Sequence, residues 1–124
     1  MRREIHERVF RLAVRVATLR TEQAFKRMAA DHIIRQLLRS TTSVAANLEE
    51  STAAQSRADF VSKVSIATKE AREMQYWLRL GHASGALSDD EWQALKQECA
   101  EIARIVSTIA RSARKPMPRA GSES

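Results

Sequence analysis

The chain has 124 residues, with 21 Lys or Arg against 15 Asp or Glu, and its formal net charge is +6 at pH 7. This length predicts one domain with its own core. The single cysteine excludes an internal disulfide and is typical of a reducing, cytoplasmic location. No apolar run approaches the roughly 18 residues that a membrane-spanning helix needs, so no membrane partner is expected.

The composition favours an all-α fold, because glycine, proline and β-branched runs are scarce. The first predicted helix covers residues 3–20. Its arginine-rich start is interrupted by Glu4 and Glu7, which favours mature structure over a transit peptide. Its predicted core seam, spaced by four and three residues, is Ile5, Val9, Leu12, Val16 and Leu19.

The second predicted helix covers residues 24–54, with Thr21 as a candidate cap. It carries two neighbouring seams at helical spacing. One seam is Ile33, Leu37, Ser40, Val44 and Asn47, and the other is Ile34, Leu38, Thr41, Ala45 and Leu48. The interior of this helix contains four mediocre helix formers, Ser40, Thr41, Thr42 and Ser43. Their presence there has to be explained by something other than helix propensity.

The third predicted helix covers residues 57–81, opened by a capping box of Ser56 and Asp59 and closed by Gly81. Its core seam is Phe60, Val64, Ala67, Ala71, Met74 and Leu78. An additional stripe is Ile66, Glu70, Glu73, Trp77 and Leu80. A helix that is apolar over two stripes has more than one neighbour, which favours self-association over a merely broad core.

The fourth predicted helix covers residues 89–114 and opens with a capping box of Ser88 and Glu91. Its seam is Trp92, Leu95, Cys99, Ile102, Val106, Ile109 and Ala113. The polar, proline-bearing residues 115–124 are predicted to be a disordered tail. Four such helices joined by short loops predict an antiparallel up-down four-helix bundle within residues 1–114.

Catalytic and metal chemistry find no support in the sequence, and no cofactor is predicted. Glu70 and Glu73 lack the histidine spacing of a di-metal bundle, because none of the three histidines lies at the required offset. Cys99 falls on a core seam, where a thiol acts as a small hydrophobe. No glycine-rich phosphate loop or Gly-x-Ser-x-Gly elbow occurs. Neither a catalytic residue nor a metal ligand is therefore assigned.

Positive charge gathers at the two ends of the sequence. Residues 1–39 have a net charge of +6, residues 40–101 of −4 and residues 102–124 of +4. Arginine matches phosphate geometry, so a basic surface formed where these ends meet would bind nucleic acid; the plainer alternative is a solvated surface. The candidates are Arg2, Arg3, Arg8, Arg11, Arg15, Arg104, Arg111, Arg114 and Lys115. Stacking aromatics typical of base recognition are absent from the pattern.

Two stretches carry a family resemblance, QLLRSTTSVAANLEE and SRADFVSKVSIATKEAREMQYWLRL. The order of Arg39, Ser40, Ser43 and Asn47, followed by Glu70, Glu73 and Trp77, resembles the bacterial four helix bundle protein family. Its founding members are encoded in intervening sequences of 23S ribosomal RNA genes. The accessory variability determinant of diversity-generating retroelements is more distantly similar. The resemblance extends to about Arg114.

The resemblance implies a homopentameric barrel without known enzymatic activity. For the retroelement relatives it implies binding to a reverse transcriptase and to RNA or DNA through a basic surface. Many members carry glycine where this chain has Glu50 and Ser51, so the second helix is expected to continue. The alternative function is a protein-interaction scaffold that binds no nucleic acid.

The polar stretch of the second helix is interpreted as a packing motif, with polar contacts between helices or protomers. Its small side chains let neighbouring helices approach closely. Arg39 and Asn47 are predicted to reach Glu70 or Glu73 on the third helix, since buried polar groups need partners. Such polar contacts would select the register and the partner more than they stabilise the fold.

Overall fold

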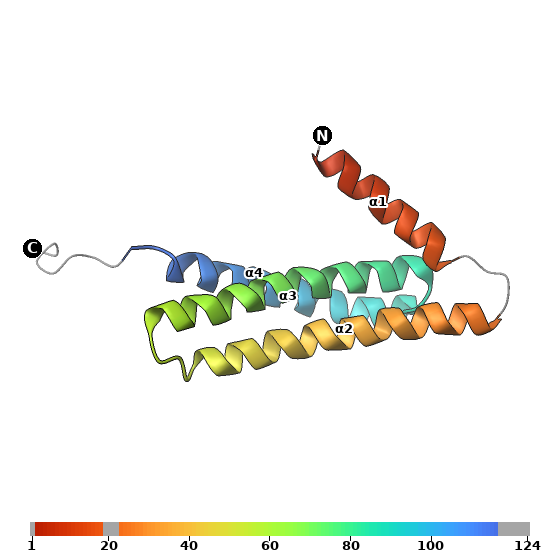
Figure 1. The fold of residues 1–124 in the computed structure, drawn as a ribbon. Helices are drawn as coiled ribbons and strands as arrows, with labels where there is room; N and C mark the ends of the chain where they lie inside the picture. The colour runs from red at the N-terminus through yellow and green to blue at the C-terminus, as the bar shows by residue number, and fades with distance from the viewer. Residues whose placement is uncertain (1, 19–22, 117–124) are drawn as a thin grey trace, which may run out of the picture.

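The computed structural model describes residues 2–18 and 23–116 (Figure 1). These residues form four helices and no strand: α1 (Arg2–Ala17), α2 (Gln23–Ser51), α3 (Arg57–Ser84) and α4 (Asp89–Ala113). The prediction of an all-helical, packed helix bundle is confirmed. The expectations for Leu19 and Thr21, and for the tail from residue 117 onward, lie outside the described residues.

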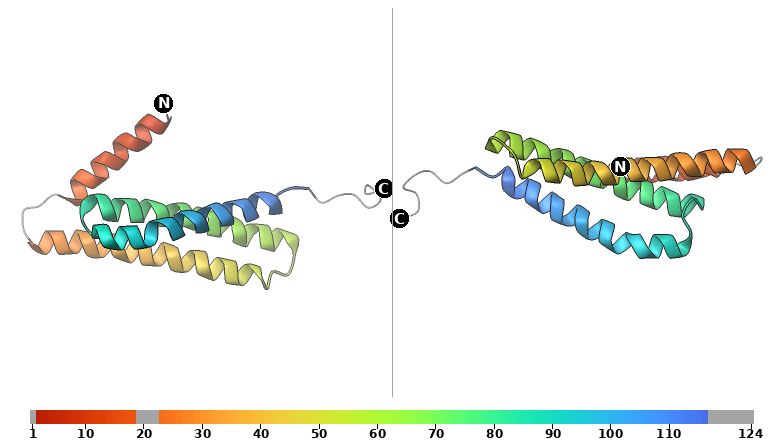
Figure 2. Two further views of the ribbon diagram at one scale, coloured as in Figure 1. Left: turned by 180° about the vertical axis from the view of Figure 1, so that it is seen from behind. Right: turned by 90° about the horizontal axis from the view of Figure 1, so that it is seen from below.

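Helix α3 is the central element of the bundle. It packs against α2, α4 and α1, whereas no Cα atom of α2 lies within 8 Å of a Cα atom of α4 among the described residues. Figures 1 and 2 show α2 and α4 running antiparallel to α3 along its two sides. The two stripes predicted on α3 therefore have neighbours within the protomer, α1 among them.

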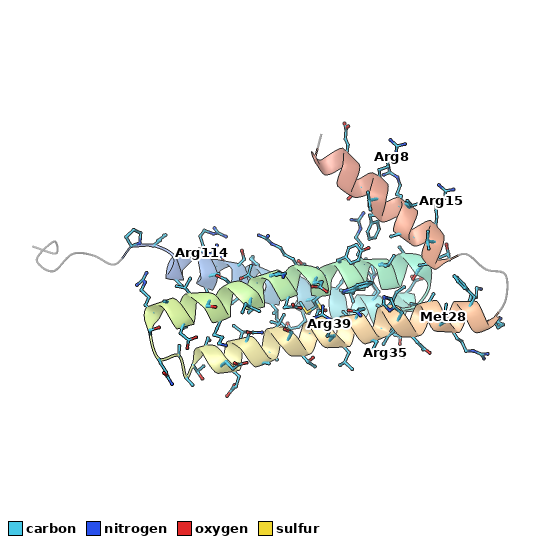
Figure 3. The ribbon with its side chains drawn as sticks, viewed as in Figure 1. Arg8, Arg15, Met28, Arg35, Arg39 and Arg114 are labelled. Atoms are coloured by element: carbon cyan, nitrogen blue, oxygen red, sulfur yellow. The ribbon has the colours of Figure 1, made fainter. Side chains whose placement is uncertain are left out.

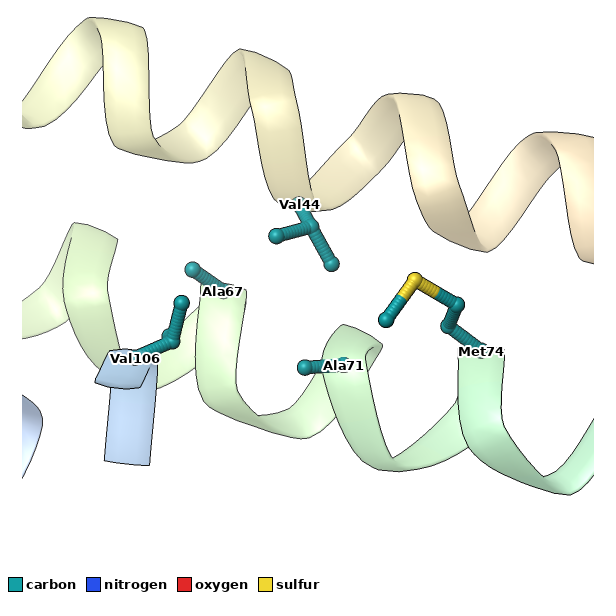
Figure 4. Close-up of a cluster of buried hydrophobic side chains, with 5 residues drawn as sticks. All are labelled: Val44, Ala67, Ala71, Met74 and Val106. Carbon is teal, nitrogen blue, oxygen red and sulfur yellow. The ribbon is translucent and has the colours of Figure 1, made fainter. Parts of the chain in front are cut away.

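The core lies where α2, α3 and α4 converge. Met74, Ala67 and Ala71 of α3 meet Val44 of α2 and Val106 of α4, and each is at most 3% exposed (Figure 4). Two alanines at the centre let α2 approach α3 closely, and Met74 fills the remaining space. The principal seams predicted for α2 and α3 therefore do face this core.

Helix α1 lies at an angle to the other three helices (Figure 1). The prediction that its seam of Val9, Leu12 and Val16 faces the core of the protomer is wrong. Val9, Leu12 and Val16 are 56%, 53% and 52% exposed. The opposite side of α1 is packed instead: Phe10 is buried in a cluster with Ile33 and Leu80. No Cα atom of α1 lies within 8 Å of α4 among the described residues, so α1 does not complete an up-down bundle between α2 and α4.

Contacts with α3 hold α1 in this position. The guanidinium of Arg79 donates to both carboxylate oxygens of Glu7, at 3.1 and 2.9 Å. The same guanidinium lies 3.7 Å from the centre of the Phe10 ring, which meets Tyr76 edge-on at 5.8 Å. A bidentate ion pair stacked on an aromatic ring fixes the orientation as well as the contact.

The predicted helix starts are confirmed for α3 and α4. The Ser56 hydroxyl accepts a hydrogen bond from the Asp59 amide at 3.0 Å. The predicted capping box is only half formed, because the Asp59 carboxylate accepts from the Gln55 amide at 3.3 Å rather than from the amide of Ser56. Ser88 and Glu91 form a reciprocal capping box. The Ser88 amide donates to Glu91 Oε1 at 2.8 Å, and the Glu91 amide donates to Ser88 Oγ at 3.1 Å. Hydrogen bonding by Ser88, first through its backbone and next through its side chain, lowers the pKa of the Glu91 carboxyl group. Acids in this first turn also suit the helix dipole.

Two predicted helix ends differ from the structure. Gly81 is not a cap, because α3 continues to Ser84 and ends at Gly85, whose φ of 86° suits glycine. Gly81 is buried, and a Cβ atom there would lie 2.9 Å from Leu87 Cδ1. Helix α2 ends at Ser51 rather than residue 54, because the next three amides bond carbonyls three residues back in a tightened turn.

Candidate nucleic-acid interface

The polar residues of α2 find their hydrogen-bond partners within their own helix. Ser40 is completely buried, and its hydroxyl donates to the carbonyls of Gln36 and Leu37 at 3.0 and 3.2 Å. Thr41 and Thr42 likewise donate to carbonyls one turn back, at 2.8 and 2.9 Å. Because these hydroxyls are engaged and Ser40 is sealed by packing, the arrangement supports a packing role.

An ion-pair cluster joins α2 to α3, as predicted for Arg39. Its Nη1 lies 3.1 Å from Glu70 Oε2, and its Nη2 contacts Glu73 Oε1. Trp77 Nε1 donates to the same Glu73 oxygen at 3.4 Å. The hydrogen bond to Glu73 and the charges of both carboxylates raise the pKa of Arg39. The cluster therefore joins four residues of the family-like pattern.

The prediction that Asn47 also reaches these glutamates is wrong. Its Nδ2 donates to the Ser43 carbonyl at 2.9 Å and contacts the Ser43 hydroxyl at 3.3 Å. A short side chain that finds an acceptor one turn back in its own helix has no donor left to cross to α3. Ser43 and Asn47 are both half-buried beside that contact.

Replacing Arg39 by alanine is expected to lower the melting temperature, because the Glu70 side chain, only 13% exposed, loses its counter-ion. Thermal denaturation followed by circular dichroism measures the change. About 1 M salt should narrow the difference from the wild type, since it screens ion pairs. Arg72→Ala, an exposed substitution on α3, is the control. Equal melting temperatures for Arg39→Ala and wild type would contradict the stabilising role.

A row of arginines runs along the outer side of α1. Arg8, Arg11 and Arg15 are spaced by three and four residues, so they share one side of the helix, and all are exposed. None forms an ion pair within the described residues. Figure 3 shows Arg8 and Arg15 extending away from the other helices. The side chains of Arg2 and Arg3 lie outside the described residues.

Of the basic residues in and directly after α4, two contact other side chains. Arg104 Nη2 lies 3.6 Å from Glu101 Oε1, and Arg114 Nη2 donates to Ser65 Oγ at 3.0 Å. Arg111 and Lys115 are exposed. The sequence-based prediction missed Arg57, which donates to the Ala113 carbonyl at 2.8 Å and to that of Lys115. Its position as the first residue of a helix antiparallel to α4 was the available signal.

The two basic rows do not meet within one protomer. Figure 3 shows Arg8 and Arg15 on α1 and Arg114 toward the opposite end of the molecule. The conditional expectation of one surface built from both ends of the sequence therefore does not hold for a single chain. The reason is the position of α1, which packs on α3 rather than beside α4. The row on α1 is the more accessible candidate, because its three arginines are exposed and form no ion pair with any other described residue.

The residues considered as metal ligands or nucleophiles were also examined for their contacts in the fold. No cluster of three His, Cys, Asp or Glu side chains suited to a metal ion occurs among the described residues. Burial, and next the charge of Glu98, raises the pKa of the Cys99 thiol. His82 contacts Asp89 at 2.7 Å and stacks on Trp92. None of the helices in the described part of the chain has the length and apolar character needed to cross a membrane.

The model of the 23S rRNA-intervening sequence protein family matches residues 2–108. The chain therefore belongs to this family. It is similar to a crystal structure from Bacteroides thetaiotaomicron, described as a protein with unknown function from the S23 ribosomal protein family. The two share 38% sequence identity with a TM-score of 0.59, over 64% of this chain and 73% of the other. No curated protein matches the sequence.

Proposed function

We propose that this member of the 23S rRNA-intervening sequence protein family is a non-enzymatic, oligomeric helix-bundle protein that presents a basic surface to RNA or to an RNA–protein complex. The observation that carries the proposal is the row of Arg8, Arg11 and Arg15 on α1, exposed and without acidic partners among the described residues. A reverse transcriptase complex is one such assembly, as the resemblance to retroelement accessory proteins implies.

The arginine row suits the phosphate backbone rather than the bases. Guanidinium groups form bidentate hydrogen bonds with phosphate oxygens. A row of arginines along one side of a helix can contact successive phosphates of one nucleic-acid strand. Base recognition in RNA commonly uses exposed aromatic rings. The aromatic rings near the arginine row pack against each other, since Phe10 and Trp77 both contact Tyr76 edge-on. The expected binding is therefore tolerant of sequence and strongly dependent on salt.

Assembly would strengthen such a surface. The family resemblance implies a homopentamer, and each copy would contribute its own row of arginines. Several weak phosphate-binding rows on one particle bind a long RNA with far higher avidity than one row alone. Eleven large apolar side chains of the described residues are exposed, which supports self-association.

Reversing the charge of the α1 row tests the proposal. Arg8→Glu/Arg15→Glu is expected to weaken binding to a single-stranded RNA at least about tenfold, and to reduce the salt slope by roughly one to two. Filter binding over a salt series measures both quantities. Lys26→Glu/Lys69→Glu carries the same change in net charge on exposed positions outside the row and is the matched control.

Wild-type binding that is absent at low salt, or unaffected by salt, would overturn the proposal, as would equal loss in the control variant. The remaining alternative, a protein-interaction scaffold, makes a different prediction. A protein partner retained after nuclease treatment, together with no RNA affinity of the purified protein, would favour that scaffold.

A further inference from the structure

An apolar groove of about 620 Å³ lies between α1 and α2, with α3 beneath it. Its walls include Val9, Leu12 and Val16 of α1 and Met28 of α2, and its floor includes Leu80 of α3. The four wall side chains are between 52% and 61% exposed, whereas Leu80 is buried. Apolar side chains gathered around one groove and open to water are typical of an interaction site.

The groove does not present a converging set of polar groups to a small ligand. Among its described lining residues, only His32, Tyr76 and Trp77 carry polar side-chain atoms. The His32 ring meets the Trp77 ring edge-on at 5.7 Å, and Trp77 Nε1 donates to Glu73 at 3.4 Å. Small-molecule sites combine apolar walls with several polar groups that fix the orientation of the ligand. The groove therefore suits the apolar face of a macromolecule.

Arginines border the groove on its α2 side. Met28 also lines an adjoining hollow together with Arg27, Asp31 and Arg35, so this border follows directly on the apolar wall. Figure 3 shows Met28 and Arg35 on the same helix. Neither arginine of this border forms an ion pair among the described residues. With one aspartate between two arginines, the α2 border is net positive.

The α1 side of the groove has a similar basic border. Val9 and Leu12 share a hollow with Arg8, Arg15 and the arginine between them in the row. Glu4 is the exposed acid one turn before this row, which remains net positive. An apolar strip with positive charge along both sides complements an apolar strip with negative charge along both sides. An amphipathic helix with acids on both sides of its apolar face has this pattern.

The chain itself does not supply a suitable occupant. Residues 19–22 and 117–124, which lie outside the described residues, contain one large apolar side chain each, Leu19 and Met117. A second copy carries the same net charge of +6 and the same basic borders, so charge repulsion disfavours it at this groove. An acidic helix of a different protein has neither disadvantage.

We propose that this groove binds an acidic amphipathic α-helix of another protein. The lining residues span residues 9–17 of α1 and 25–33 of α2, roughly 12 Å of each helix, which corresponds to two or three turns of the bound helix. Apolar side chains of that helix enter the groove, and its carboxylates pair with Arg15 and Arg35 on the two borders. The inference goes beyond the RNA proposal, in which the apolar walls and the α2 arginines have no part.

A pair of synthetic peptides tests the binding. One is a helix of about 18 residues with leucines at spacings of three and four and glutamates on both sides; the other has lysines in place of the glutamates. Neither contains an aromatic residue. The Trp92→Phe variant leaves Trp77, which lines the groove, as the only tryptophan of the chain. The glutamate peptide should change the Trp77 emission saturably and bind at least about tenfold more tightly than the lysine peptide.

Uncharged substitutions in the walls test the location of binding. Val16→Ser/Met28→Ser, in the Trp92→Phe background, should weaken binding of the glutamate peptide at least about tenfold, because less apolar area is buried. Both side chains are exposed, so circular dichroism should show unchanged helix content. Leu38→Ser/Ile105→Ser changes two exposed apolar residues outside the groove and should leave peptide binding unchanged.

Charge reversal on the α2 border tests the selection for an acidic partner. Arg27→Glu/Arg35→Glu should weaken binding of the glutamate peptide and strengthen binding of the lysine peptide, so that the preference narrows or inverts. Lys69→Glu/Arg111→Glu makes the same change in net charge at exposed positions outside the groove and should retain the preference.

Three results would overturn the inference: no saturable binding of the glutamate peptide, equal affinity for both peptides, or undiminished binding in the wall variant. A fall in mass by light scattering for Val16→Ser/Met28→Ser alone would also overturn it, because a second copy would then occupy the groove. The RNA proposal is tested separately. The wall variant keeps the charge of the protein, so its RNA binding should equal that of the wild type.

Discussion

Replacing Met74 by alanine is expected to lower the free energy of unfolding by about 2–5 kcal/mol, the largest effect of any single truncation in this core. Met74 is 1% exposed and lies against Val44 and Ala71, between α2 and α3. Its removal leaves a cavity that two small, already close neighbours cannot fill. Urea denaturation at one protein concentration, followed by circular dichroism, measures the change.

The neighbouring Gln75→Ala provides the control for this measurement. Gln75 is exposed on the same helix, so its truncation removes no core contact, and alanine is a slightly better helix former. Its free energy of unfolding should stay within about 0.5 kcal/mol of the wild type. A loss below about 1 kcal/mol for Met74→Ala would show that the α2–α3 packing at this level is not as described.

The second large effect is expected at Ser40, where the size of the side chain matters more than its hydroxyl. Ser40→Leu should destabilise the protein by about 1–3 kcal/mol, because a fully buried position cannot take the additional atoms without moving α2 from its neighbours. Ser40→Ala should be nearly neutral. Its hydroxyl bonds only carbonyls of its own helix, and alanine raises helix propensity.

The two Ser40 variants together decide between packing and chemistry for the polar stretch of α2. Equilibrium denaturation of both, at matched concentration, gives the comparison. A neutral Ser40→Leu variant would show that the position has free space. A strongly destabilised Ser40→Ala variant would show that the hydroxyl itself is required, which contradicts a motif selected for small size.

The helices α2, α3 and α4 were predictable because local chemistry and periodicity agree there. Ser88 and Glu91 satisfy each other's backbone donors with residues three positions apart, so their capping box can be read without tertiary information. Likewise, Val64 and Met74 lie on the same predicted core seam of α3, and both are buried. Arg39 and its glutamates were predictable as partners because both helices present complementary charges beside their seams.

For helix α1, local chemistry and periodicity did not suffice to predict which side is buried. Val9, Leu12 and Val16 form a seam at helical spacing, but so do Phe10, Val14 and Ala17 on the other side of the helix. Periodicity alone therefore predicts either stripe of α1 to face the core. The choice is made by Arg79 of α3, which pairs with Glu7 and covers Phe10 from a distance of more than sixty residues in the chain.

The sequence by itself determined that the chain is helical, where α3 and α4 begin and that the principal seams of α2 and α3 are buried. These properties depend on groups within one or two turns of each other. Only the tertiary structure decided that α1 packs on α3, that Gly81 lies against Leu87 and that the two basic rows remain apart. Each of these depends on the shape and charge of a surface built by distant residues, which helical spacing alone does not encode.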